Sequence, residues 1–181
     1  MRIIAGEFRS RRLKVPRGHD VRPTSDRIRE SIFNILSGRL EFEGRSVADL
    51  YAGSGALGLE ALSRGAAGVS FVERSPRVIR VARENAASLG VLQRCEFLTE
   101  NVRDFLRRTP PASFDVVFAD PPYDSADLER LPAAATRVIK PSGFLILEHD
   151  QRHDFSEARS FLTRRPYGGT VVTIFQTSGS E

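Results

Sequence analysis

The sequence predicts an α/β protein with a mostly parallel, doubly wound sheet, an antiparallel hairpin at its C-terminal side and a small basic hairpin arm at the N-terminus. The first observation is that short apolar runs alternate with helical patterns. The runs lie at 46–51, 68–73, 95–99, 114–120 and 143–149, and the helical patterns at 57–64, 76–89, 102–108 and 126–138. The second is that the last two runs, 160–163 and 171–176, are joined only through residues 166–169, as in a hairpin.

The third observation is the uneven distribution of charge. Nine basic and three acidic residues give residues 1–29 a net charge of +6, whereas the rest of the chain has a net charge of −2. Residues 2–5 and 12–15 flank Gly6 and Ser10 and predict a short hairpin that stands apart from the core. We therefore divide the chain into an arm at 1–25 and a main domain at 26–181, which begins with a helix after a cap at Thr24 or Ser25.

The basic arm indicates a polyanionic partner, although a solvated charged face is an equally simple interpretation. Arginine can contact phosphate with two parallel hydrogen bonds. The candidate contacts to such a partner are Arg9, Arg11, Arg12, Lys14, Arg17 and Arg22.

Composition narrows the class of protein further. With 181 residues, 40% hydrophobic and 28% charged, the chain suits one folded domain rather than a disordered, collagen-like or coiled-coil protein. No apolar run approaches the roughly 18 to 20 residues of a membrane span, and Glu7 interrupts any signal peptide, so we expect a cytoplasmic protein. The single Cys95 excludes an internal disulfide, and the three histidines lack a common ligand spacing, so no metal is expected.

A glycine-rich turn follows the first predicted strand. Residues 49–58 read DLYAGSGALG, and Glu73 ends the second strand twenty residues after Gly53. This pattern favours a nucleoside cofactor, with backbone close to the ligand and a carboxylate on the ribose hydroxyls. Because Asp49 would repel a pyrophosphate, the turn suits the cationic amino acid end of S-adenosylmethionine better than NAD. A tight turn without a ligand stays open as the alternative.

The fourth strand ends in Asp120-Pro121-Pro122-Tyr123. An exocyclic amine on a nucleobase is a poor nucleophile because its lone pair is delocalised into the ring. The Asp120 carboxylate and the Pro121 carbonyl can accept both amine hydrogens, while the two prolines fix the backbone. Tyr123 offers a face for stacking of the base. A proline turn closed by a core tyrosine is the structural alternative.

These motifs together resemble the bacterial 16S rRNA guanine-N2 methyltransferases that act on the guanine numbered 966. The likeness covers residues 1 to about 150. It includes the glycine turn, the Asp120–Tyr123 motif and the N-terminal stretches 2–6, 22–24 and 26–30. The resemblance implies a seven-stranded, Rossmann-like class I methyltransferase sheet. It also implies S-adenosylmethionine as donor, S-adenosylhomocysteine as product, and 16S rRNA as partner, in the 30S subunit or a late assembly intermediate. The basic residues of the N-terminal arm would then be the candidate RNA contacts. We expect a monomer.

The resemblance also implies roles for individual residues. Asp49, Gly53 and Gly55 would hold the methionine end of the cofactor, Glu73 the ribose, and the stretch at Asn101 and Val102 the adenine. The full set of expected cofactor contacts is Asp49, Tyr51, Ala52, Gly53, Ser54, Gly55, Glu73, Arg74, Asn101, Val102 and Asp120. The expected catalytic residues are Asp120, Pro121, Pro122 and Tyr123.

Three other functions stay open. A DNA adenine-N6 methyltransferase uses the same chemistry, but residues 1–45 leave no room for a DNA-recognition domain. An NAD-dependent oxidoreductase is disfavoured by Asp49. A non-catalytic RNA-binding protein that has kept the fold is the third.

Overall fold

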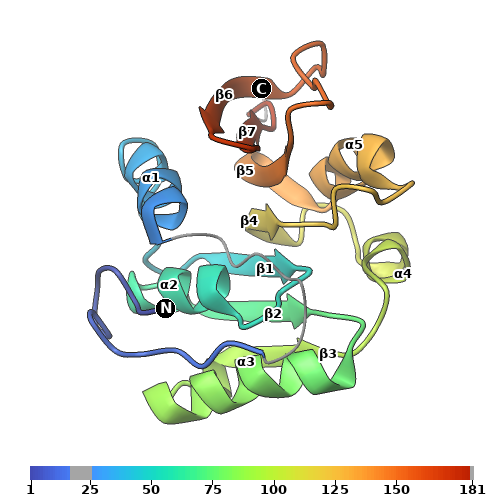
Figure 1. Ribbon diagram of the computed structural model, residues 1–181. Helices are drawn as coiled ribbons and strands as arrows, with labels where there is room; N and C mark the ends of the chain where they lie inside the picture. The colour runs from blue at the N-terminus through green and yellow to red at the C-terminus, as the bar shows by residue number, and fades with distance from the viewer. Residues whose placement is uncertain (17–25, 180–181) are drawn as a thin grey trace.

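A computed structural model describes residues 1–16 and 26–179 and places a seven-stranded sheet at the centre of the molecule (Figure 1). The strands are β1 (Ser46–Leu50), β2 (Gly68–Val72), β3 (Cys95–Leu98), β4 (Phe114–Ala119), β5 (Ile139–Asp150), β6 (Phe161–Tyr167) and β7 (Thr170–Gln176). Their order is β3-β2-β1-β4-β5-β7-β6. The first five pair in parallel, whereas β7 is antiparallel to both β5 and β6. The predicted fold class is confirmed.

Helices cover both faces of this sheet (Figure 1). One face carries α1 (Asp26–Ser37), α2 (Ala56–Ser63) and α3 (Pro76–Leu89), and the other carries α4 (Val102–Arg108) and α5 (Leu131–Arg137). Short 3-10 turns lie at η1 (Leu92–Arg94) and η2 (Leu128–Arg130). In the described part of the chain, none of the helices has the length and apolar character needed to cross a bilayer.

The sequence explains the ends of the longest helix. The Ser75 side chain accepts a hydrogen bond from the Val78 amide, and Pro76 occupies the first turn, where its missing N–H costs nothing. Gly90 ends α3 with a φ of 76°, a conformation that glycine adopts without strain.

Alternate residues of each central strand pack into two separate apolar cores. On β4, Val116 and Phe118 join the core under α1 and α2, whereas Val117 and Ala119 join the core under α4 and α5. A strand that is buried on both faces is a continuous apolar run, which is why residues 114–119 are recognisable in the sequence.

Three predicted elements differ from the structure by more than one residue. The strand predicted over 143–149 begins four residues earlier, at Ile139. The helix predicted over 126–138 is divided into η2 and α5. Pro166 and Tyr167 belong to β6 rather than to the turn, which leaves Gly168 and Gly169 between the strands. Because β6 is the edge strand, a proline there removes no hydrogen bond from the sheet interior.

The N-terminal segment, residues 1–16, differs most from the prediction. Its two ends pair as in the predicted hairpin, through an antiparallel bridge between Arg2 and Arg12 and backbone hydrogen bonds on either side of it, but they form no extended strands. It does not stand apart, because Ile3, Phe8 and Leu13 are buried in the core under α1 and α2. The predicted arm continues to residue 25, and residues 17–25, with the candidate contacts Arg17 and Arg22, lie outside the described part of the chain.

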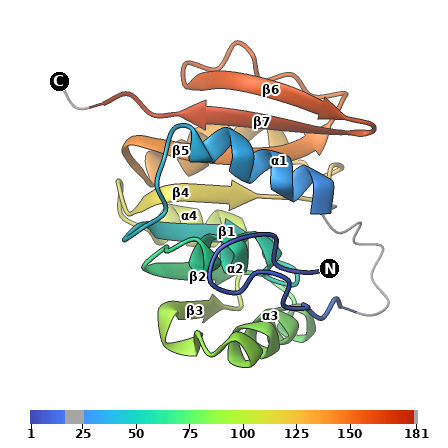
Figure 2. The ribbon, with the colours of Figure 1, turned by 90° about the vertical axis from the view of Figure 1, so that its left-hand side faces the viewer.

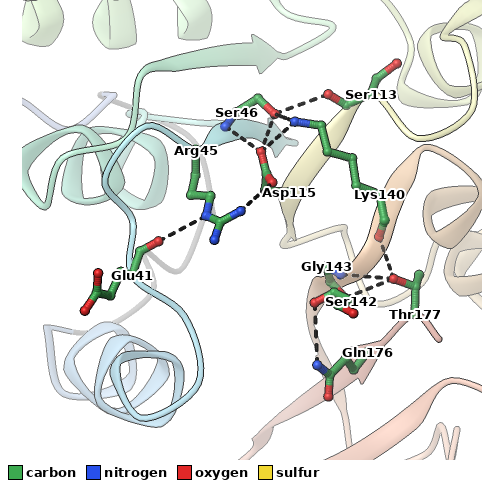
Figure 3. Close-up of polar contacts among 10 residues, drawn as sticks. All are labelled: Glu41, Arg45, Ser46, Ser113, Asp115, Lys140, Ser142, Gly143, Gln176 and Thr177. Carbon is green, nitrogen blue, oxygen red and sulfur yellow. Dashed lines mark hydrogen bonds and ion pairs between the residues drawn. The ribbon is translucent and has the colours of Figure 1, made fainter. Parts of the chain in front are cut away.

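Polar contacts close the amino-end edge of the sheet around Asp115 (Figure 3). Its carboxylate accepts hydrogen bonds from the Ser46 amide at 2.9 Å, the Ser46 hydroxyl at 2.7 Å, Lys140 Nζ at 2.8 Å and Arg45 Nη1 at 3.2 Å. Burial alone would raise the pKa of Asp115, but the hydrogen bonds from Lys140 and Ser46 outweigh it and hold the pKa well below its usual range. Asp115 therefore joins the starts of β1, β4 and β5.

Candidate functional site

Three carboxylates meet at the opposite, carboxyl-end edge of the sheet. Asp49 is on β1, Glu73 follows β2 and Asp120 follows β4, and these three strands are neighbours. Asp49 is buried, and its carboxylate accepts a hydrogen bond from the Gly58 amide at 2.9 Å. Burial, then the nearby charges of Asp120 and Glu73, raise the pKa of Asp49 to about 8. Three carboxylates so close together suit a cationic ligand.

The glycine turn between β1 and α2 is built from left-handed backbone. Tyr51, Gly53 and Gly55 have φ values of 58°, 56° and 78°. A Cβ added to Gly53 would meet only the Tyr51 carbonyl, at 3.8 Å, so this side of the turn is open to close approach. A Cβ on Gly58 would lie 2.5 Å from the Phe71 ring, so the last glycine serves packing of α2 on the sheet. The glycines of the motif therefore have different roles.

Other side chains of the turn face the protein. Ala52 and Ser54 are buried, the Ser54 hydroxyl lies 3.6 Å from Met1 Sδ, and the Ser54 carbonyl accepts from Asn85 Nδ2 at 2.9 Å. Any contact that these two residues make with a cofactor would come from the backbone. The sequence did not indicate that the N-terminal segment touches this turn.

The residues expected around the ribose and adenine lie next to one another but are partly used by the fold. One Glu73 oxygen accepts from the Ser75 amide at 2.9 Å. Asn101 caps α4 by accepting from the Arg103 amide at 2.8 Å, and the Val102 side chain is buried. Arg74 is exposed. The second Glu73 oxygen and the Asn101 amide nitrogen are thus the atoms that could contact a nucleoside.

Tyr51, in the glycine turn between β1 and α2, is also affected by charged residues outside the turn. Burial, followed by the charge of Asp127, raises the pKa of Tyr51 to about 12, against the opposing charge of Arg74. Its hydroxyl therefore stays protonated at neutral pH.

The two proline carbonyls of the motif after β4 differ in their backbone hydrogen bonds. The Pro122 carbonyl accepts from the Ser125 amide at 3.0 Å and so belongs to a turn. Within residues 1–16 and 26–179, no backbone amide donates to the Pro121 carbonyl. The Tyr123 hydroxyl lies 3.1 Å from the Thr170 hydroxyl, which fixes the ring relative to the start of β7. This arrangement fits the predicted use of the Pro121 carbonyl as an acceptor in the site.

The candidate RNA contacts fall into two groups in the structure. Arg9 and Arg12 are exposed, and in the described part of the chain neither side chain forms a hydrogen bond or ion pair. Arg11 donates to the Ser88 carbonyl at 2.7 Å, and Lys14 pairs with Glu84 at 2.8 Å, which lowers the pKa of Glu84. Arg11 and Lys14 therefore also attach the segment to α3.

Three buried polar residues that the sequence analysis missed hold the N-terminal segment in place. Glu60 accepts from the amides of Ile4 and Ala5 at 2.8 and 3.1 Å. Ser63 accepts from the Phe8 amide at 2.9 Å, and the Asn85 carboxamide both accepts from the Lys14 amide and donates to the Lys14 carbonyl. A carboxylate on the mostly apolar and entirely buried helix α2 was the available signal, because such a group requires partners.

Comparisons with known proteins agree with this architecture. A family model described as Conserved hypothetical protein 95 matches residues 1–176. The chain is 33% identical to YlbH of Bacillus subtilis, over 99% of this chain and all of YlbH. It is 40% identical to Ribosomal RNA small subunit methyltransferase D of Escherichia coli K12, over 80% of this chain and 69% of that protein.

Solved structures of methyltransferases also resemble this chain. The structure of yhhF from Escherichia coli has a TM-score of 0.86 and 30% identity, covering 99% of both chains. An RNA methyltransferase from Salinibacter ruber in complex with S-adenosylhomocysteine has a TM-score of 0.67 over 88% of this chain and 95% of that one, and at 16% identity it supports the fold alone. The chain belongs to the Conserved hypothetical protein 95 family, is related to the ribosomal RNA small subunit methyltransferases D, and has a class I methyltransferase fold.

Proposed function

We propose that this protein transfers a methyl group from S-adenosylmethionine to the exocyclic N2 of a guanine of the 966 type in 16S rRNA. Methyl transfer to small-subunit ribosomal RNA follows from family membership and from 39–40% identity to named relatives. The choice of guanine N2, the 30S subunit or a late assembly intermediate as substrate, the monomeric state and the cytoplasmic location are parts of the proposal.

The observation that supports it best is the meeting of Asp49, Glu73 and Asp120 beside the Asp-Pro-Pro-Tyr turn. Burial, followed by repulsion from the other two carboxylates, raises the pKa of Asp49 to about 8, and a bound cation would favour its charged form. S-adenosylmethionine carries an ammonium and a sulfonium, and when bound it supplies an electrophilic methyl group. Asp49 and the open backbone at Gly53 would hold its methionine end, and Glu73 its ribose. The residues present fit this cofactor.

The motif residues account for activation of the amine. The Asp120 carboxylate and the Pro121 carbonyl would accept one amine hydrogen each, which keeps the nitrogen lone pair directed away from the ring. Asp120 would accept the proton that the amine nitrogen loses when it receives the methyl group, and S-adenosylhomocysteine would be the leaving product. Tyr123, held by Thr170, would stack on the base once it leaves its own stack. Positioning of the two reactants supplies most of the acceleration.

The N-terminal segment would contact the RNA backbone. Arg9 and Arg12 are the first candidates, because their guanidinium groups are exposed and form no hydrogen bond or ion pair with the described residues. Arg11 and Lys14 would contribute mainly by holding the segment on α3. Arg17 and Arg22 complete the proposed set on the sequence pattern alone.

Incubation with methyl-labelled S-adenosylmethionine tests the proposal. The substrates are 30S subunits lacking the modification, naked 16S rRNA and double-stranded DNA, and the labelled nucleoside is identified by mass spectrometry after digestion. We expect N2-methylguanosine from one site in the 30S sample. Label on DNA adenine would support the alternative methyltransferase, and RNA binding without label on any substrate would support a non-catalytic RNA-binding protein.

A further inference from the structure

A pocket of about 300 Å³ lies on the α4–α5 face of the sheet, outside the carboxylate cluster. Leu106 on α4 and Leu131 and Ala134 on α5 provide its apolar wall, and Tyr51 closes it toward the carboxyl end of β1. Four arginines from α4, η2 and α5 complete the lining: Arg103, Arg107, Arg130 and Arg137. Nothing in the proposed reaction uses these arginines.

The charge of this pocket is strongly positive, because Asp127 is the only carboxylate in the lining. Arg107 pairs with Asp104 at the surface, and Arg137 donates to the carbonyls of Leu106 and Thr109, so these two are partly occupied. Arg103 and Arg130 are exposed, and no ion pair to either is formed by the residues that the structure describes. Exposed arginines close enough to share one pocket repel one another, so an anionic ligand would stabilise the arrangement.

We propose that this pocket binds the phosphodiester backbone of the substrate RNA next to the target guanine, with Arg103 and Arg130 as the phosphate contacts. The proposal rests on the proposed function and adds a second RNA contact to it. Guanidinium groups bind phosphate oxygens through paired hydrogen bonds, and the aromatic and apolar wall suits the sugar or base of the same nucleotide. S-adenosylmethionine is a poor candidate, because it has no phosphate and its sulfonium would be repelled.

The position of the pocket explains why a second contact would be useful. The N-terminal segment lies on the α2–α3 side of the sheet, whereas α4 and α5 lie on the other side (Figure 1). Figure 2, turned by 90°, shows the segment in front of α2 with α4 behind the sheet. The carboxyl end of β1, which carries Tyr51, lies between them. RNA held on both sides would present a base to the edge of the sheet with less freedom than RNA held on one side.

The experiment compares two variants with the same change in charge. The test variant combines Arg103→Gln and Arg130→Gln. The control combines Arg39→Gln and Arg159→Gln, exposed residues near the end of α1 and the start of β6, at the amino-end edge of the sheet. For both we measure affinity for 16S rRNA between 50 and 300 mM salt, affinity for S-adenosylmethionine by calorimetry, and turnover at saturating RNA.

In the test variant we expect the slope of log affinity against log salt to fall by about 1.4, or about 0.7 for each lost phosphate contact. RNA affinity should fall about tenfold or more at 0.1 M salt, while cofactor affinity and turnover at saturating RNA stay at the wild-type level. The control variant should change the slope by less than half as much.

An unchanged salt slope, or an equal loss in the control variant, would overturn the proposal while the methyltransferase function stands. A loss of cofactor affinity with normal RNA affinity would also overturn it, by assigning the pocket to the cofactor. The methyl-labelling assay tests the proposed function independently of the pocket. If that function is wrong, the wild-type protein will label no RNA.

Discussion

Two aspartates on neighbouring strands, at opposite edges of the same sheet, have opposite electrostatic surroundings. Asp115, at the amino-end edge, accepts four hydrogen bonds from neutral and cationic donors, and its pKa is held well below the usual range. Asp49, at the carboxyl-end edge, has the Gly58 amide as its hydrogen-bond donor and two carboxylates nearby, and its pKa is raised to about 8. At the first edge, the carboxylate is neutralised by groups of the protein itself. At the second edge, a bound cation would stabilise the charged form of Asp49.

The charge of the neighbouring groups distinguishes an aspartate that stabilises the fold, Asp115, from one that suits ligand binding, Asp49. A buried carboxylate with cationic partners strengthens a fold, whereas one surrounded by other acids weakens it. Destabilising arrangements of this kind are concentrated at functional sites, where a ligand compensates for them. The comparison can be tested by removing one carboxylate at a time.

Asp120→Ala should have the largest effect. Loss of an acceptor for the target amine should lower turnover at least ~100-fold, in the range seen when one preorganised polar group is removed from an active site. Affinity for S-adenosylmethionine, measured by calorimetry, should fall far less than turnover, because Asp49 and Glu73 remain, and the melting temperature should stay close to that of the wild type. An active Asp120→Ala variant would show that the site is assigned wrongly.

Asp49→Asn should weaken cofactor binding by roughly 30-fold or more, because one partner of a buried charge pair would be lost. Asparagine keeps an acceptor for the Gly58 amide, so the cofactor-free variant should be at least as stable as the wild type at pH 8. Calorimetric titration and urea unfolding measure the two effects. A variant that binds the cofactor normally would remove Asp49 from the site.

Asp115→Asn should lower stability and leave cofactor binding unchanged, the opposite of Asp49→Asn. The loss of charge-assisted hydrogen bonds to Lys140 and Arg45 should lower the free energy of unfolding by about 2 kcal/mol. Cofactor affinity and turnover of the folded protein should be unchanged, because the network lies at the other edge of the sheet (Figure 3). Urea unfolding at pH 7, with Lys140→Met and the double variant, isolates the pairwise contribution. A loss of cofactor affinity in Asp115→Asn would contradict the division between the edges.

The smallest effect is a pH dependence of opposite sign at the two edges. The pKa of Asp49 is higher in the folded protein than the ordinary 3.8, so its contribution to stability is lost as the pH rises toward about 8. The pKa of Asp115 is lowered, so its contribution is present above about pH 4 and is lost as the pH falls below that value. Unfolding curves of wild type, Asp49→Asn and Asp115→Asn from pH 3 to 9 measure both slopes. Parallel curves for all three proteins would show that neither aspartate titrates as inferred.

Most of the sheet could be predicted from the sequence because its strands are local apolar runs with strong boundaries. The range of α3 is the predicted one, fixed by Ser75, Pro76 and Gly90. The Asp49, Glu73 and Asp120 cluster was also predictable, because the carboxyl ends of parallel strands meet at one edge. These features depend on residues close in the chain or on a topology that handedness rules determine.

Contacts between distant segments could not be predicted. Glu60 binds amides 55 and 56 residues away, and this is why the N-terminal segment packs on α2 instead of standing apart. The Asp115 network likewise joins residues up to 94 apart, and the arginine pocket gathers α4, η2 and α5. The sequence by itself determined the order of strands and helices, the motifs at the strand ends and the basic N-terminus, since these depend on local periodicity and composition. Only the tertiary structure decided which of the basic and acidic groups are neutralised, because charge pairing depends on distances that folding alone creates.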